Sequence, residues 1–393
     1  MLSAPTLKNS IFLAVEAEPP DSMRQHHRPP EIPYAIFNRA TLTILLLTAM
    51  VIFLSMGAKQ KNMAWGGNID RKPGISIRVA ETKPENIVTG QVSGIDNPDE
   101  VRIVVFIQTN RWYAQPYEDN RAYLPINRAG TFKTWVRDWR QISAFVIRNG
   151  YNALAEQDPY GQFPLRIDNK NVLACTSLPA IKFSGREWAI RAGDELDPGI
   201  HDFSSANVSV DGQGRLHLKT TFREGKWRCA QVSLMQPLGY GTYTFHLVGR
   251  VDQLDKYVVA SPFLYADTKK KEDKLEFDVE FARWGDEFGP NAQFVLQPFT
   301  VSGHRERFFL TLSQEYSTHV IRWTANSISF RSSQGLTQTP APQDIAHEWT
   351  IGGEKVPKDG DKLLVNLSLW VLTDKNPAKE EELIVESFEW QPL

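Results

Sequence analysis

The sequence predicts an all-β protein, and three observations lead to this class. Short runs in which apolar and polar residues alternate follow one another from residue 75 to the C-terminus, as at 241–247 and 320–323. Alternation with a period of two is typical of half-buried strands. Glycine, proline, asparagine and aspartate separate the runs and predict turns. In the same region no stretch shows the apolar periodicity of an amphipathic helix.

Composition narrows the function classes. A chain of 393 residues is long enough for two domains plus extra segments. The 44 Lys and Arg residues balance 46 Asp and Glu residues, so no nucleic-acid surface is expected. The aromatic share of 11%, with 11 Trp and 21 Phe residues, fits both β-sheet cores and carbohydrate binding. Cys175 and Cys229 have no metal-ligand or redox spacing, and whether they pair stays open. We expect no metal and no cofactor.

The N-terminal part predicts a membrane anchor. Residues 1–39 form a tail rich in proline and charge, and residues 40–58 contain no charged side chain. The second segment is long enough to span a bilayer core as a single helix. A cleaved signal peptide is the alternative. However, the 39 residues before the apolar segment are long for its leader, and a cut after Ala58 would place Met56 at the −3 position, where cleavage sites have a small residue. We therefore expect a single-pass membrane protein. The charges that flank the segment do not settle its orientation, and the β domains are expected on the extracytoplasmic side, where polysaccharide is found.

Residues 75–180 form the first predicted domain. The runs 87–92 and 101–107 alternate as strands do, and turn residues at 94–98 and 127–130 separate such runs. About a hundred residues with this spacing fit an immunoglobulin-like β-sandwich. Its aromatic residues Trp112, Tyr113 and Tyr117 form either a platform for sugars or ordinary packing; the sequence leaves both open.

Residues 181–393 form the second predicted domain. Alternating runs recur at 215–219, 327–330 and 383–390, with no helical stripe between them. About 210 residues of this pattern suit a two-sheet jelly roll, in which one concave sheet can hold an extended polymer.

One strand of this domain carries three carboxylates. Glu276, Asp278 and Glu280 alternate with apolar residues, so in a strand all three point to the same face. Neighbouring like charges raise the proton affinity of at least one of them. Cleavage of a glycosidic bond uses one ionised and one protonated carboxyl group. The competing interpretation is a solvated strand face without chemistry.

Several segments of residues 183–393 resemble glycoside hydrolase family 16, the β-jelly-roll glucanases. The resemblance implies that Glu276 is the nucleophile, Asp278 its electrostatic helper and Glu280 the acid/base. Arg228 and Trp370 are expected to bind substrate in the cleft, the alternative being structural packing or pairing. Trp284, just past the carboxylates, is expected either to stack on a sugar of the substrate or to pack in its loop. The segments that carry the resemblance are 211–218, 227–228, 240–243, 258–265, 276–281, 318–323 and 366–370.

The spacing of the carboxylates, with no extra residue before Glu280, resembles mixed-linkage β-glucanases and xyloglucan-type transglycosylases. The run 293–297 departs from these subclasses, which usually have more Asn and Tyr there. Backbones four residues apart on a flat strand are separated by about 13 Å. The carboxyl groups of retaining enzymes lie about 5–5.5 Å apart. The two long Glu side chains would therefore have to lean together.

These observations predict a membrane-anchored retaining glycoside hydrolase that cleaves a β-1,3-1,4- or β-1,3-glucan, with polysaccharide as its partner. Two alternatives stay open. A transglycosylase would use the same residues with a sugar in place of water, and an envelope protein would bind polysaccharide without cutting it. His319 is expected to be a hydrogen-bonded core residue rather than a catalyst.

Overall fold

The computed structural model describes residues 72–80, 86–109, 111–115, 122–137, 139–159, 162–167, 169–196, 200–266, 275–353, 356–359 and 363–393. Asn68–Leu393 forms one compact unit. Its described part consists of strands and four short 3-10 helices, which confirms the all-β class. The predicted tail 1–39 and membrane span 40–58 lie outside the described residues. Within the described ranges, no helix is long and apolar enough to cross a bilayer.

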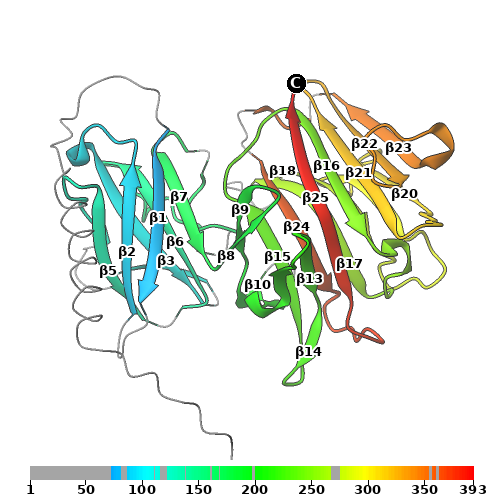
Figure 1. Ribbon diagram of the computed structural model, residues 1–393, viewed down its shortest axis with the longest axis horizontal. Coiled ribbons are helices and arrows are strands. Elements are labelled where there is room, and N and C mark those ends of the chain that lie inside the picture. Colours follow the sequence, from blue (N-terminus) through cyan, green and yellow to red (C-terminus); the bar gives the residue numbers. More distant parts are fainter. Residues whose placement is uncertain are drawn as a thin grey trace, which may run out of the picture. The chain divides into compact units, whose positions relative to one another are not determined.

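Two small sheets lie at the N-terminal end of this unit (Figure 1). They enclose an apolar cluster to which Val88 and Phe132 contribute from one sheet and Ile103 and Ile142 from the other. The first sheet has the order β1 (Gly74–Ala80), β2 (Asn86–Ser93), β5 (Thr131–Val136). The second has the order β4 (Trp112–Gln115), β3 (Val101–Gln108), β6 (Gln141–Arg148), β7 (Val172–Leu178).

Trp112 is 1% exposed, so it packs in the interior instead of presenting a sugar platform. Tyr113 packs against the apolar cluster of the small sheets, and Tyr117 lies outside the described residues. The immunoglobulin-like assignment and the boundary between residues 180 and 181 stay predictions.

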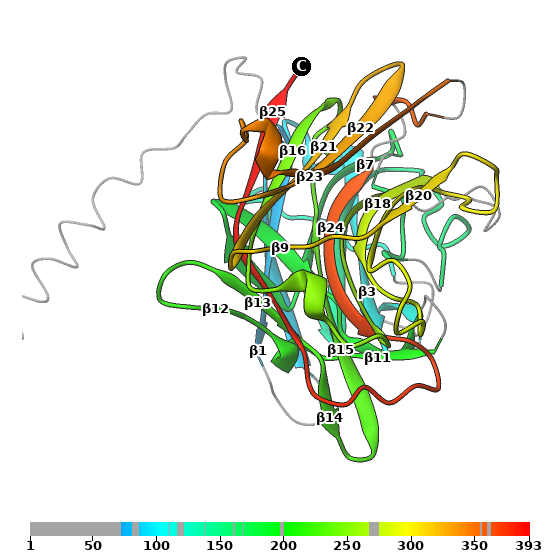
Figure 2. The same ribbon diagram turned by 90° about the vertical axis from the view of Figure 1, so that its right-hand side faces the viewer.

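Two larger sheets follow, and in Figures 1 and 2 they face each other as two layers. The first has the order β10 (Gly193–Leu196), β11 (His201–Phe203), β15 (Lys226–Leu234), β24 (Leu364–Val371), β17 (Val258–Ala266), β18 (Leu275–Phe281), β19 (Ala292–Leu296), β20 (Arg305–Phe308). Three further strands join it through β15: β8 (Ala180–Phe183), β9 (Arg186–Ile190) and β14 (Thr221–Arg223).

The second large sheet has the order β12 (Val208–Val210), β13 (Leu216–Lys219), β25 (Glu382–Pro392), β16 (Gly241–Val248), β21 (Tyr316–Trp323), β22 (Ser327–Gln334), β23 (Ile345–Gly352). The 3-10 helices are η1 (Pro98–Glu100), η2 (Ser205–Asn207), η3 (Val251–Gln253) and η4 (Pro342–Asp344). Two facing sheets, antiparallel throughout except for the parallel pair β11–β15, agree with the predicted sandwich.

The main apolar core lies between the two large sheets. Phe277, Val279 and Phe281 of β18 are fully buried in it, and Phe277 packs against Trp323 with ring centroids 5.6 Å apart. Each buried Phe side chain contributes roughly 1.5–3 kcal/mol relative to an exposed one. This burial determines which face of β18 points inward. The other face therefore carries the carboxylates.

The buried histidine His319 belongs to the same core. Its ring lies 4.6 Å from the Phe281 ring, and both ring nitrogens hydrogen-bond with serine hydroxyls, Ser332 Oγ and Ser317 Oγ, each at 2.9 Å. Burial lowers the pKa of His319 to about 3. It is thus a neutral core residue on the second sheet, as expected, and not part of the carboxylate face.

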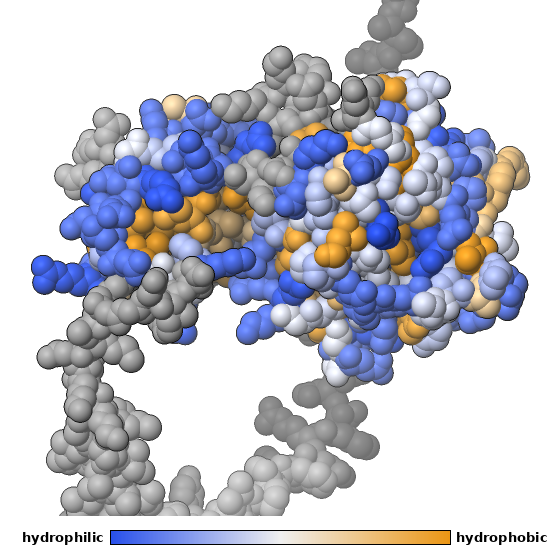
Figure 3. All heavy atoms as spheres, turned by 90° about the horizontal axis from the view of Figure 1, so that it is seen from above, coloured by the Kyte–Doolittle hydropathy of each residue, from blue (hydrophilic) through white to orange (hydrophobic). Residues whose placement is uncertain are grey.

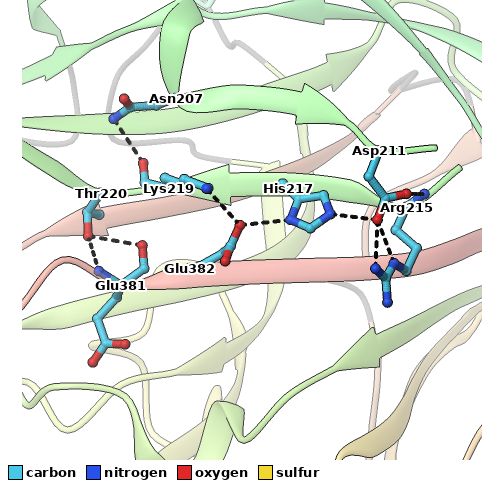
Figure 4. A network of polar contacts seen from close by, with 8 residues as sticks. All are labelled: Asn207, Asp211, Arg215, His217, Lys219, Thr220, Glu381 and Glu382. Carbon is cyan, nitrogen blue, oxygen red and sulfur yellow. Dashed lines mark hydrogen bonds and ion pairs between the residues drawn. The ribbon is translucent and has the colours of Figure 1, made fainter. Parts of the chain in front are cut away.

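A polar network on the second sheet connects the turn before β13 to β25 (Figure 4). His217 hydrogen-bonds with Glu382 Oε1 at 2.7 Å and with Asp211 Oδ2 at 3.1 Å. Arg215 donates to the same Asp211 oxygen at 2.8 Å. Hydrogen bonds from the Arg215 backbone and from the His217 side chain lower the pKa of Asp211. The network stabilises the strand pairing at this edge, and the sequence patterns did not reveal it.

Polar residues cover most of the face shown in Figure 3, and apolar surface is limited to separate areas of it. Both cysteines are free thiols, and Cys229 is 1% exposed. Burial raises the pKa of each thiol to about 12. Neither is therefore poised as a thiolate nucleophile.

Candidate active site

The three carboxylates lie on one face of β18, opposite its buried aromatic residues. Asp278 is 2% exposed, whereas Glu276 and Glu280 are half-buried. The alternation read from the sequence thus appears in the structure as a strand with an apolar face toward the core and an acidic face away from it. Antiparallel pairing with β17 and β19 places this strand well inside its sheet.

Glu280 has the protonation behaviour of a general acid. Burial raises the pKa of Glu280 to about 7, and the negative charge of Glu276 adds to the increase. A hydrogen bond from Gln293 Nε2 to Glu280 Oε2, at 2.5 Å, and the charges of Arg305 and Arg307 act in the opposite direction. A half-protonated carboxyl near neutral pH can give a proton and later take one back. The charge that helps to keep Glu280 protonated is that of Glu276.

Neighbouring strands supply an aromatic and polar environment for the carboxylates. On β17, Phe263 lies directly opposite Asp278, and Tyr265 lies opposite Glu276. On β19, Gln293 lies opposite Glu280. Residues directly opposite each other in antiparallel strands share a face. The acidic face is therefore flanked by two half-buried aromatic rings on one side and an amide donor on the other.

The structure brings the two predicted tryptophans together. The rings of Trp284 and Trp370 contact each other edge to face, with centroids 5.9 Å apart. Trp284 is 37% exposed and follows the end of β18. Trp370 lies on β24 opposite Val259, and its ring also packs on His201 at 5.0 Å. Trp370 and Asn366 are four residues apart on β24, so their side chains point to the same face of the sheet. Asn366 is opposite Phe263, which is opposite Asp278, so Trp370 lies on the face that carries the carboxylates.

Arg228 forms ion pairs with acidic residues other than the three carboxylates. Its guanidinium forms ion pairs with Asp194 of β10 at 3.1 Å and with Asp202 of β11 at 3.2 Å. Alternate residues of a strand point to the same face of the sheet, so the side chain of Arg228 points to the same face as Ala230, which lies in the core. Gln231 points to the opposite face, which carries the carboxylates and is called the polar face. The structure thus joins Arg228 to an edge cluster beside a cavity of about 310 Å³, and not to the three carboxylates.

A larger cavity, of about 780 Å³, lies on the small sheet β1-β2-β5 and includes Arg78, Gln91 and Lys133 in its lining. The lining residues include no carboxylate, histidine or cysteine. Within the described ranges, no group of three or more His, Cys, Asp or Glu side chains could hold a metal ion.

Sequence reasoning did not single out Gln293 as the partner of Glu280, or Phe263 and Tyr265 as neighbours of the other two carboxylates. The strands that carry these three residues were recognisable in the sequence. Knowing which of their positions lie opposite the carboxylates would have identified the residues. The missing information was the register between strands, which local alternation does not contain.

No family model and no curated protein matches the sequence. Among solved structures, a β-glucanase of Bacillus licheniformis is 19% identical, with a TM-score of 0.41 over 52% of this chain and 92% of that one. A β-1,3-1,4-glucanase from a mouse hindgut metagenome is 18% identical, with a TM-score of 0.38 over 52% and 93%. A pseudo β-1,3-glucanase and immunostimulatory antigen of Mycobacterium tuberculosis is 12% identical, with a TM-score of 0.41 over 52% and 91%. With TM-scores below 0.5 and identities below 20%, these likenesses decide nothing about the function of this chain.

Proposed function

We propose that this protein is a retaining glycoside hydrolase that cleaves a β-linked glucan of the β-1,3-1,4 or β-1,3 type. The observation that carries the proposal is the pair Glu276 and Glu280 on one strand face. Burial and the charge of Glu276 raise the pKa of Glu280 to about 7. One ionised and one protonated carboxyl group, coupled by their charges, is the arrangement that double displacement requires.

In the first step, Glu276 attacks the anomeric carbon while Glu280 gives its proton to the departing glycosidic oxygen. The bond to the leaving sugar breaks, and a covalent glycosyl-enzyme forms through the Glu276 oxygen. In the second step, the ionised Glu280 takes a proton from water, and the water oxygen displaces Glu276 from the same carbon. Two inversions give net retention. Asp278, between the two on the same face, is positioned to orient Glu276.

Stereochemistry tests the mechanism directly. Proton NMR early in the hydrolysis of a β-1,3-1,4-glucan should show the β-anomer as the first product. Glu276→Ala and Glu280→Ala should each lose most activity, and azide should restore turnover with opposite anomeric outcomes in the two variants. A first product with the α configuration would refute the retaining assignment. Circular dichroism of both variants provides the control for folding.

A transglycosylase would use the same two carboxylates with a sugar hydroxyl as acceptor. Adding an acceptor oligosaccharide separates the two reactions, because a transglycosylase would then release longer products in place of reducing ends. A binding protein without catalysis is the third possibility, since a fold by itself does not imply a reaction. Such a protein would bind the glucan and give no product in either assay.

We further propose that residues 40–58 anchor the enzyme in a membrane with the β domains on the extracytoplasmic side, where polysaccharide is found. The absence of charged residues in that segment supports this proposal. Protease added to intact spheroplasts should degrade the β domains. Protection that is lost only on lysis would place them inside the cell.

A further inference from the structure

A glutamine from the segment between β6 and β7 reaches the polar face of the large sheet. Gln162 Nε2 donates to Asn366 Oδ1 at 2.5 Å and also to the hydroxyl of Ser233. Asn366 is fully buried, and its Oδ1 accepts further hydrogen bonds from Ser233 Oγ at 2.6 Å and from Gln231 Nε2 at 3.3 Å. Gln162 thus completes a polar network that covers this part of the sheet.

The network lies at the level of the carboxylates. Asn366 on β24 is directly opposite Phe263 on β17, and Phe263 is directly opposite Asp278 on β18. Adjacent strands are about 4.8 Å apart, so the backbones of Asn366 and Asp278 are roughly 10 Å apart. A polymer that crosses the strands over Asp278 would therefore meet the Gln162 side chain just beyond Phe263.

Apolar packing holds Gln162 in this position. The residues that follow it, Phe163 and Leu165, are 4% and 1% exposed. They belong to an apolar cluster that also contains Met235 of the loop after β15 and Leu364 of β24. Leu364 lies opposite Tyr265, the neighbour of Glu276. Because close-packed side chains resist displacement, Gln162 is a fixed boundary of the polar face.

We propose that Gln162 is a specificity-determining residue that closes the polar face on the β24 side of the carboxylates. From Asp278, a glucan chain can then extend in one direction over β18, β19 and β20. In the other direction, along the row Asp278, Phe263 and Asn366, it has space only as far as Phe263. The enzyme should accordingly release short products of narrow length distribution. This inference rests on the proposed hydrolase function and adds to it the mode of cleavage.

Product length tests the proposal with a matched pair of variants. Gln162→Ala removes the amide from the polar face. Gln157→Ala, in the same segment, removes an amide that donates to the Trp112 carbonyl at 2.8 Å and is the control. Mass spectrometry of early products from a β-1,3-1,4-glucan should show a narrow range for the wild type and the control, and a shift to longer products for Gln162→Ala. Identical product lengths in all three folded proteins would overturn the proposal.

A binding experiment tests the same inference without catalysis. Titration calorimetry of gluco-oligosaccharides of increasing length uses the Glu276→Gln protein, with and without Gln162→Ala. With Gln162 present, affinity should stop rising at a short chain length. With Gln162→Ala, longer chains should bind about fivefold more tightly, which corresponds to about 1 kcal/mol. Gln162→Ser, which keeps a polar side chain, serves as a second variant if the alanine variant folds poorly.

The outcomes separate the two proposals. If the wild type cuts no glucan but the length dependence of binding changes as described, the hydrolase proposal fails and the role of Gln162 stands. If the wild type cuts glucan and neither product length nor binding responds to Gln162→Ala, the role of Gln162 fails and the hydrolase stands. If neither protein binds an oligosaccharide, both proposals fail.

Discussion

The alkaline limit of activity should depend on one hydrogen bond, from Gln293 to Glu280. This bond is 2.5 Å long and favours the ionised form of the carboxyl group, so it lowers the pKa of Glu280 against the larger effect of burial. Gln293→Leu removes the donor with little change in volume. Since the charged form loses its partner, the pKa of Glu280 should rise and the general acid should remain protonated at higher pH.

The magnitude follows from the strength of the bond. A hydrogen bond to a charged group contributes about 1.5–3 kcal/mol, and 1.36 kcal/mol corresponds to about one pH unit. The wild-type activity should fall with a midpoint near pH 7 on the alkaline side. In Gln293→Leu that midpoint should move upward by about one to two pH units. The maximal rate can change as well, but the midpoint is read independently of it.

The assay is kcat/KM for a soluble β-1,3-1,4-glucan from pH 5 to 9, in buffers of constant ionic strength. Gln391→Leu makes the same chemical change at an exposed position on β25 of the other sheet and should leave the midpoint unchanged. A midpoint that stays in place or moves downward in Gln293→Leu would refute the assignment of Glu280 as the acid whose pKa this bond controls.

Three further predictions concern stability and substrate binding. Glu280→Gln should be inactive, yet at pH 8 it should unfold at a temperature several degrees higher than the wild type. Because the pKa of Glu280 is raised in the folded state, the wild-type protein loses stability as the pH rises from the unfolded pKa of Glu280 through about 7, and the glutamine variant does not undergo this loss. Calorimetry at pH 5 and pH 8 measures this, and an equal difference at both pH values would contradict it. The folded pKa of His319 is lowered to about 3, so the wild type should lose stability as pH falls below the unfolded pKa of His, about 6.5. Urea unfolding of His319→Gln, which keeps polar contacts to the two serines, should show a weaker loss between pH 7 and pH 4.5; an unchanged loss would mean that other groups cause it. Trp370→Ala should raise KM for gluco-oligosaccharides and leave the alkaline midpoint of kcat/KM unchanged, since the ring contacts Trp284 and His201 and not Glu280; a shifted midpoint would indicate a link to the acid.

Local alternation of apolar and polar residues is enough to predict the all-β class and the acidic face of β18. Both follow from local alternation: once Phe277, Val279 and Phe281 are buried in the core, the three carboxylates have to lie on the other face. The core position of His319 was also predicted, because its strand alternates. These features depend on residues that are close together in the chain.

The groups that surround the carboxylates come from strands and segments that are distant in the sequence. The partner of Glu280 comes from β19, and the amide that closes the polar face comes from Gln162, 204 residues before its acceptor Asn366. Arg228 pairs with Asp194 and Asp202, and the alternation along β15 turns its side chain away from the sheet face that carries Gln231. Strand register and the packing of distant segments produce these contacts, and neither is encoded in the period of a single strand.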